Sequence, residues 1–162
     1  MTQPSLFISH GAPDLALSDT PARRFLERLG GEIARPDAIL IASAHDEADG
    51  VAVRAPARFR TWHDFGNFDP RLFEMRYEPA GATDVAEEAL RLLDQAGLAP
   101  RRDPSDRIDH GAWVPLSLLF PAADVPVAQR RQRPADPLVP ARIAARVDRH
   151  HGDRNVGRGE QQ

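Results

Sequence analysis

Three histidines stand in sequence contexts that favour metal binding. His10 follows the apolar run Leu6–Ile8, and His45 follows the apolar run Ala38–Ala42. His110 stands further along, between an aspartate and a glycine. Imidazoles placed where parallel strands end are suited to holding a transition metal over a cleft. The pattern is therefore typical of a metalloenzyme.

Each histidine also has a purely structural interpretation. A lone histidine often caps a neighbouring helix or fills a polar gap in a core, and Asp109 and His110 could simply begin the helix that follows them. Two histidines in matching contexts, His10 and His45, favour the metal site over this alternative.

The elements needed to position these residues can be read from periodicity and from capping signals. The first part of the chain predicts a strand over Leu6–Ile8, a helix capped by Thr20-Pro21 and ended by Gly30-Gly31, and a strand over Ala38–Ala42 buried on both faces. Strand, helix and strand in this order predict a right-handed parallel crossover, which would bring His10 and His45 to one edge of the sheet.

The remaining elements complete an α/β pattern. They are a short strand over Val51–Arg54, a helix opened by Asp69-Pro70, a helix capped by Thr83 and ended by Gly97, a short helix over Ala112–Leu119 that contains Pro115, and a buried strand over Asp124–Ala128. The fold class predicted is α/β, with a mostly parallel or mixed sheet flanked by helices.

Composition narrows the function classes. The chain has 162 residues, a net charge of −3 and no cysteine, so it is expected to be one domain whose metal ligands are histidines or carboxylates. It offers no signal for nucleic acid, for a secretory leader or for a membrane span, so we expect a cytoplasmic protein. A homo-oligomer is left open.

Four ordered motifs resemble one family, the class III (LigB-type) extradiol ring-cleavage dioxygenases, and within it the branch of DOPA 4,5-dioxygenase-like proteins. The motifs are Ser9-His10-Gly11-Ala12-Pro13, Ser43-Ala44-His45, Thr61-Trp62-His63-Asp64-Phe65 and Asp109-His110-Gly111-Ala112-Trp113. The resemblance covers residues 4 to about 129.

The resemblance implies a site with named roles. His10 and His45 would bind Fe(II) or Zn(II), and His110 would act on bound catechol or dioxygen. His63 and Asp64 would border the substrate cleft. The implied reaction opens a catecholic ring, DOPA-like in this branch, with dioxygen as co-substrate.

Two departures from the family pattern count against a complete dioxygenase site. Asp46 stands where the family usually has Trp, and the family continues well beyond Val127 to a third histidine and a further ligand. Without these, the α/β domain would be incomplete relative to the family domain. The pair His150-His151 lies in an Arg-rich context that does not favour a ligand role.

The character of the sequence changes at Gln129. Residues 130–162 hold eight arginines, four acidic residues and no aromatic residue. A basic disordered arm, a poorly packed amphipathic helix and an out-of-frame translation all fit this composition. We therefore expect two parts: residues 1–129, the N-terminal part of the dioxygenase-like domain, and residues 130–162, an Arg-rich tail.

Three functions remain open at this stage. The first is a ring-opening dioxygenase, and the second is a catalytically dead, truncated family member that binds metal weakly. The third is a zinc hydrolase that uses the same histidines with Asp46 or Asp109 as its base.

Overall fold

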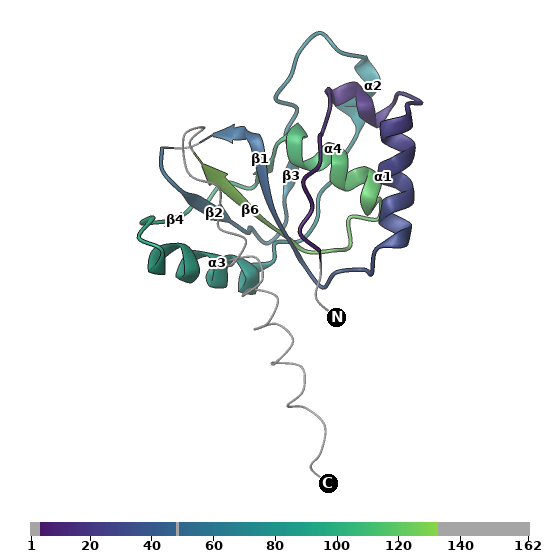
Figure 1. The fold of residues 1–162 in the computed structure, drawn as a ribbon. Coiled ribbons are helices and arrows are strands. Elements are labelled where there is room, and N and C mark those ends of the chain that lie inside the picture. Colours follow the sequence, from purple (N-terminus) through teal and green to yellow (C-terminus); the bar gives the residue numbers. More distant parts are fainter. Residues whose placement is uncertain (1–3, 48, 133–162) are drawn as a thin grey trace.

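A four-stranded mixed sheet forms the centre of the computed structural model, which describes residues 4–47 and 49–132. The strand order is β1-β6-β2-β4 (Figure 1). The strands are β1 (Ile39–Glu47), β2 (Ala52–Arg54), β4 (Arg101–Arg102) and β6 (Val127–Gln132). β6 pairs parallel with β1 and antiparallel with β2, and β2 pairs parallel with β4. β3 (Arg60–Thr61) and β5 (Arg107–Ile108) form a second, parallel pair.

Helices cover both faces of this sheet (Figure 1). They are the short 3₁₀ helix η1 (Pro13–Ala16), α1 (Pro21–Glu32), α2 (Pro70–Glu74), α3 (Thr83–Gln95) and α4 (His110–Leu119). Ile39 and Ile41 of β1 pack with the core formed by α1, α4 and η1, whereas Leu40 packs with α3. This alternation is what a strand between two helical layers requires. The predicted α/β class with a mixed sheet and flanking helices is confirmed.

Local signals explain where the two helices nearest the histidines begin. Thr20 caps α1 by accepting a hydrogen bond from the Arg23 N–H at 3.2 Å, and Pro21 occupies the first helical position. Asp109 caps α4 by accepting from the Gly111 N–H at 3.0 Å. α4 carries Pro115 in its interior and buries all but one of its residues, so its apolar composition outweighs the helix-breaking tendency of proline.

Two strand predictions are wrong. Residues Leu6–Ile8 form no strand, because no neighbouring strand among the described residues supplies a ladder for them. Residues Ala38–Ala42 do belong to β1, but they are not buried on both faces: Ile39, Leu40 and Ile41 are half-buried and Ala42 is exposed. The reason is that β1 is an edge strand of the sheet.

Three predicted boundaries shift as well. Gly30-Gly31 does not end α1, which continues to Glu32. Thr83 is the first residue of α3, with Ala82 at the capping position. The last strand runs from Val127 to Gln132, whereas the prediction was Asp124–Ala128.

The proposed division at residue 129 remains a prediction, since residues 133–162, with His150-His151, lie outside the described residues. Among the described helices, none has the length and apolar character needed to cross a membrane.

Candidate metal centre

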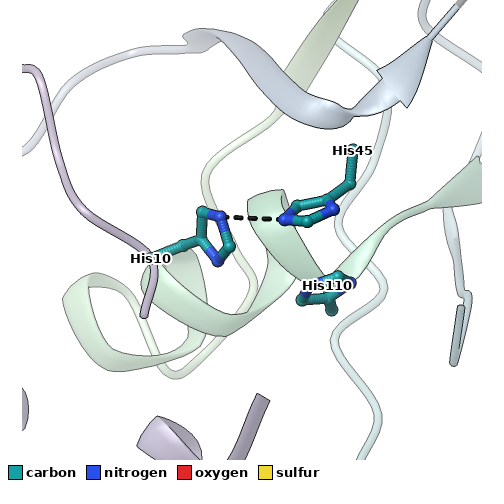
Figure 2. A group of neighbouring side chains, drawn as sticks. All are labelled: His10, His45 and His110. Carbon is teal, nitrogen blue, oxygen red and sulfur yellow. Dashed lines mark hydrogen bonds between the residues drawn. The ribbon is translucent and has the colours of Figure 1, made fainter. Parts of the chain in front are cut away.

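The three histidines singled out by the sequence converge on one point (Figure 2). One ring nitrogen from each of His10, His45 and His110 lies within 4.8 Å of the others. Nε2 of His10 is 3.0 Å from Nε2 of His45. The ring centroid of His110 lies 4.2 Å from that of His45 and 5.4 Å from that of His10.

An irregularity in β1 directs His45 towards this point. Ala42 pairs with Arg130 and Glu47 pairs with Gln132, so β1 uses more residues than β6 over the same stretch. The extra residues include His45 and Asp46, and they bulge out of the regular ladder. A bulge of this kind re-aims side chains and is frequent beside active sites. Here it leaves His45 exposed and Asp46 buried.

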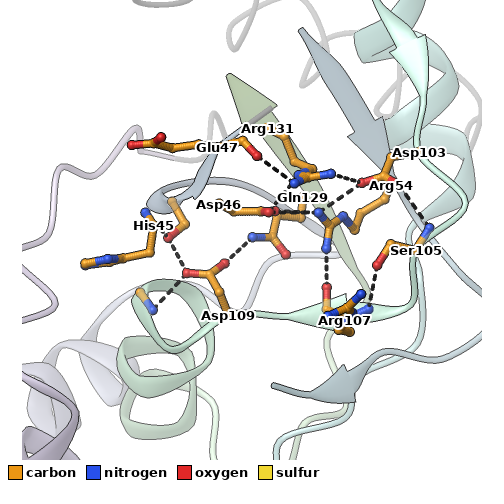
Figure 3. Close-up of polar contacts among 12 residues, drawn as sticks. His45, Asp46, Glu47, Arg54, Asp103, Ser105, Arg107, Asp109, Gln129 and Arg131 are labelled. Carbon is orange, nitrogen blue, oxygen red and sulfur yellow. Dashed lines mark hydrogen bonds and ion pairs between the residues drawn. The ribbon is translucent and has the colours of Figure 1, made fainter. Parts of the chain in front are cut away.

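Asp109 links the strand that carries His45 to the helix that carries His110 (Figure 3). Its carboxylate is fully buried and accepts hydrogen bonds from the Ser43 hydroxyl, from the Gln129 side-chain amide and from the Gly111 N–H. The Ser43 hydroxyl oxygen in turn accepts a hydrogen bond from the His45 N–H at 3.2 Å. The two histidines are therefore held by one buried carboxylate.

Gly111 allows this close approach. A Cβ at this position would lie 3.0 Å from Cδ2 of His45 and would overlap the Ser43 hydroxyl. Such separations are tighter than van der Waals contact allows, so a larger residue would push α4 away from β1.

The environment of His10 favours its neutral form. Burial lowers its pKa below the ordinary value of 6.5, and the neighbouring charges that His45 and His110 would carry lower it further. Its Nδ1 is buried and has no hydrogen-bond partner among the described residues. A neutral imidazole is the form that binds metal.

His110 also contacts Asp64, which was predicted only as a residue of the cleft border. Asp64 Oδ1 accepts the His110 backbone N–H at 3.0 Å and lies 3.0 Å from its Nδ1. The latter contact does not meet hydrogen-bond geometry, and it is an ion pair only when the His110 ring is protonated. Burial would raise the pKa of Asp64, but the interactions with His110 outweigh it and the net direction is down. Asp64 therefore favours the ionised form.

His63 does not belong to the three-histidine cluster. Its Nε2–H donates to the Met75 carbonyl at 3.2 Å, and its ring packs against Phe65, Phe73 and Trp113. Asp64 thus contacts a histidine of the cluster, whereas the His63 ring packs among aromatic side chains. Trp113 is fully buried, as expected for a core anchor.

A buried ion-pair cluster lies behind the site, and sequence reasoning missed it (Figure 3). Arg54 Nη2 is 2.7 Å from Asp46 and 2.9 Å from Asp103, and Arg131 contacts the same two carboxylates at 2.6 and 2.9 Å. We name these four residues the Arg54 cluster. Asp46 is thereby occupied on the side away from His45, and Asp109 is occupied by its three donors. Neither carboxylate is therefore placed as the free base that the zinc-hydrolase interpretation needs.

The arrangement can therefore hold a divalent transition metal through neutral imidazoles. Two ligand nitrogens about 2.1 Å from one metal and at right angles to each other lie about 3.0 Å apart. The His10–His45 separation of 3.0 Å fits that spacing, and it also suits an N–H···N hydrogen bond in the metal-free protein.

Comparison with known proteins connects this geometry to a family. Residues 4–135 match the family model described as the catalytic LigB subunit of aromatic ring-opening dioxygenase. The chain is 40% identical over 129 residues to a 4,5-DOPA dioxygenase extradiol of Beta vulgaris, covering 77% of this chain and 48% of the relative. It is 34% identical over 126 residues to the protein of the same name from Escherichia coli (strain K12), covering 78% and 46%.

A solved structure agrees with the sequence comparisons. The crystal structure of an uncharacterized protein from Escherichia coli K12 superposes with a TM-score of 0.57 at 29% identity, covering 75% of this chain and 44% of that one. The chain spans about half the length of the curated relatives it matches.

Proposed function

Because the chain belongs to the LigB family of aromatic ring-opening dioxygenases, we propose that its histidine site binds a divalent metal and opens a catecholic ring with dioxygen. The convergence of His10, His45 and His110 is the observation that carries this proposal. The printed names of the relatives point to DOPA or a DOPA-like catechol as the substrate class.

The metal proposed is Fe(II), with Zn(II) as the ion that the same imidazoles would also accept. His10 and His45 are the proposed ligands, since their Nε2 atoms face each other and His10 favours its neutral form. A catecholic substrate would bind such a metal through its two oxygens, and Fe(II), when bound, would supply the redox chemistry that makes dioxygen reactive towards the ring. The carbon–carbon bond beside the diol would break, and both atoms of dioxygen would enter the product. The catechol supplies the electrons, so the reaction needs no external reductant.

His110 is proposed as the catalytic proton-transfer residue. Its imidazole lies beside the two proposed ligands, where a catechol hydroxyl would have to lose its proton. Asp64 contacts the Nδ1 side of the ring and favours its carboxylate form, so it can stabilise a protonated His110. His63 borders this region but makes its own hydrogen bond elsewhere, so we propose a packing role for it.

A second candidate function is metal binding without turnover. It is favoured by one observation: the chain matches only 48% and 46% of the length of two relatives named as dioxygenases. Ring opening requires open coordination positions on the metal and a complete substrate pocket around it. A chain that matches about half of a relative can hold the metal and still lack the rest of the catalytic pocket.

Metal stoichiometry and oxygen uptake together test the proposal. We expect the anaerobically reconstituted protein to bind one Fe(II) and to consume oxygen with L-DOPA, forming a yellow ring-opened product. His45→Ala should lose the metal, whereas His110→Gln should keep it and lose turnover. The double variant His150→Ala/His151→Ala is the histidine-matched control, and it should keep both the metal and the turnover.

The outcomes separate the two candidates. Unchanged metal content in His45→Ala would overturn the ligand assignment. Stoichiometric metal without oxygen uptake would select the non-catalytic candidate. Loss of metal in His110→Gln would make His110 a third ligand instead of a proton-transfer residue.

A further inference from the structure

A row of aromatic side chains leads from His110 towards the surface. The Phe65 ring lies 5.7 Å from the His110 ring at an angle of 83°, and the Phe73 ring lies 5.2 Å from the Phe65 ring. The His63 ring lies 5.8 Å from Phe65 and 5.7 Å from Phe73. Exposure increases outwards, since His110 is 6% exposed, Phe65 is half-buried and Phe73 is 38% exposed. We call His63, Phe65 and Phe73 the aromatic row.

Contacts on the buried side hold the aromatic row in place. The Trp113 ring is fully buried and lies 5.9 Å from the His63 ring and 6.4 Å from the Phe65 ring. The His63 Nε2–H donates to the Met75 carbonyl at 3.2 Å. A fixed aromatic surface binds a planar ring at little entropic cost, and edge-to-face and offset contacts between rings are favourable. The row can therefore contact an aromatic ligand beside His110.

Arg76 lies at the outer end of the aromatic row. Its Nη1 donates hydrogen bonds to the carbonyls of Phe73 and Met75 at 2.7 and 2.8 Å. The Met75 carbonyl also accepts from His63, so the guanidinium shares an acceptor with the row. Arg76 is exposed, and no carboxylate in residues 4–47 and 49–132 forms an ion pair with it. A positive charge without an ion-pair partner among these residues thus lies beside the row.

Helix capping explains part of this arrangement. α2 ends at Glu74, and arginines near the C-terminus of a helix commonly donate to its last carbonyls. Both hydrogen bonds of Arg76 come from Nη1, whereas its Nε and Nη2 make none within the described part of the chain. These remaining N–H groups belong to a planar fork that matches the two oxygens of a carboxylate. The guanidinium can therefore cap α2 and still bind an anionic group of a ligand.

We propose that Arg76 and the aromatic row determine which catechols the site accepts. Phe65 contacts the catechol ring beside His110, and Arg76 binds a carboxylate carried by the substituent of that ring. The preferred ligands hold this carboxylate several bonds beyond the ring, because Phe65 and Phe73 separate His110 from the segment that carries Arg76. These roles rest on the proposed function, since they require the catechol hydroxyl groups to lie at the histidines.

Ligand binding by the Zn(II)-loaded full-length chain tests these roles without turnover. The probes are dihydrocaffeate and its methyl ester, which share the catechol ring and the length of the substituent and differ in the negative charge. We expect isothermal titration calorimetry to show that the acid binds at least about fivefold more tightly than the ester, because only the acid forms charge-assisted hydrogen bonds with a guanidinium.

Three variants separate charge from ring contact. Arg76→Gln should weaken the acid alone and so abolish the preference, and Arg76→Lys should restore part of it because it keeps the positive charge. Phe65→Leu should weaken the acid and the ester alike, by about threefold or more, because it removes the contact between rings. Zinc content should not change in Arg76→Gln, since Arg76 donates only to the carbonyls of Phe73 and Met75 among the described residues.

Arg58→Gln is the matched control. Arg58 is likewise exposed and donates from Nη1 to a backbone carbonyl, but that carbonyl belongs to Glu78, at 2.7 Å. This variant should keep the preference of the unmodified chain for the acid.

Three results would overturn the proposed roles. An unchanged preference in Arg76→Gln would make Arg76 a helix cap only, and an equal loss of acid and ester in that variant would show an effect on structure instead of charge. Unchanged affinities in Phe65→Leu would rule out the ring contact.

These outcomes can be distinguished from a failure of the proposed function. Nuclear magnetic resonance titration of the chelator-treated chain measures the same preference without metal. A preference for the acid without oxygen uptake would count against the proposed function alone. Oxygen uptake without a preference for the acid would count against the role of Arg76 alone.

Discussion

Asp109 shows how much of the site depends on one buried side chain. It caps α4, it fixes Ser43 next to His45, and it accepts from Gln129 on β6. Burying a carboxylate without partners is costly, and here each of the three donors offsets part of the desolvation of Asp109. The separation between His45 and His110 is therefore set by hydrogen bonds that contact neither imidazole ring.

The ionisation of His10 predicts a pH dependence of stability. Its pKa in the folded protein lies below the ordinary value of 6.5, so the unfolded chain binds more protons between the two values. Stability then rises with pH through that window, and the metal-free protein should unfold at lower denaturant at about pH 5.5 than at about pH 7.5. Urea titrations in the presence of a chelator measure this difference.

His10→Gln is the variant that isolates the effect. It keeps a polar side chain and removes the titrating group, so the difference between the two pH values should shrink. An unchanged difference would show that His10 does not carry the linkage.

Part of the site could be predicted from the sequence alone. The histidines and the cap at Asp109 stand in short motifs, so their roles can be predicted locally. The partners of Asp109 cannot, because Ser43 and Gln129 lie 66 and 20 residues away and reach it only through the parallel pairing of β1 with β6. Asp46 was noticed as a departure from the family, but its partner Arg54 follows from the bulge in β1, which has no local sequence signal.

Two adjacent glycines of α1 play different structural roles. A Cβ on Gly30 would lie 2.8 Å from the carbonyl carbon of Leu119, at the end of α4, whereas a Cβ on Gly31 would meet nothing within 4 Å. Gly30 therefore permits the close packing of α1 on α4. That packing explains why α1 continues past a pair of glycines that would usually end a helix.

The contrast predicts opposite effects of one substitution. Gly30→Ala should destabilise the protein by about 1–3 kcal/mol, because it overpacks the α1–α4 contact. Gly31→Ala should stabilise it by about 0.5–1 kcal/mol through helix propensity. Urea unfolding of both variants measures the difference, and equal effects would rule out the packing role of Gly30.

At the element level, prediction succeeded where the signal is local and failed where it depends on neighbours. The start of α1 at Thr20-Pro21 and of α2 at Asp69-Pro70 follow from capping chemistry. The expected strand over Leu6–Ile8 did not form, because a strand exists only when another strand accepts its hydrogen bonds. The short β3, β4 and β5 were not predicted, since two residues carry no periodicity.

At the scale of the whole molecule, the Arg54 cluster ties together strands that come from distant parts of the chain. Arg54 belongs to β2, Asp46 to β1 and Arg131 to β6, and Asp103 follows β4. Every strand of the main sheet thus contributes to or adjoins one buried set of charges. The Arg54 and Asp46 side chains are 2% and 1% exposed, so water cannot replace a missing partner.

This cluster predicts that a single substitution weakens the whole sheet. Arg54→Met fills much of the same volume but leaves Asp46 and Asp103 with Arg131 alone, and breaking a buried pair in this way costs about 3–5 kcal/mol. Arg60→Met removes an ion pair with Asp106 whose side chains are 71% and 42% exposed, so it should cost at most about 1 kcal/mol. Urea unfolding followed by circular dichroism compares the two.

The cooperativity of urea unfolding tests the role of the Arg54 cluster more directly than the unfolding midpoint does. Because the cluster joins all four strands, Arg54→Met should lower the midpoint for the whole sheet in one cooperative step, with the histidine site lost at the same denaturant concentration. Loss of metal binding well before the loss of secondary structure would mean that the site and the sheet are stabilised separately. An Arg54→Met protein as stable as Arg60→Met would mean that Arg131 alone compensates both carboxylates.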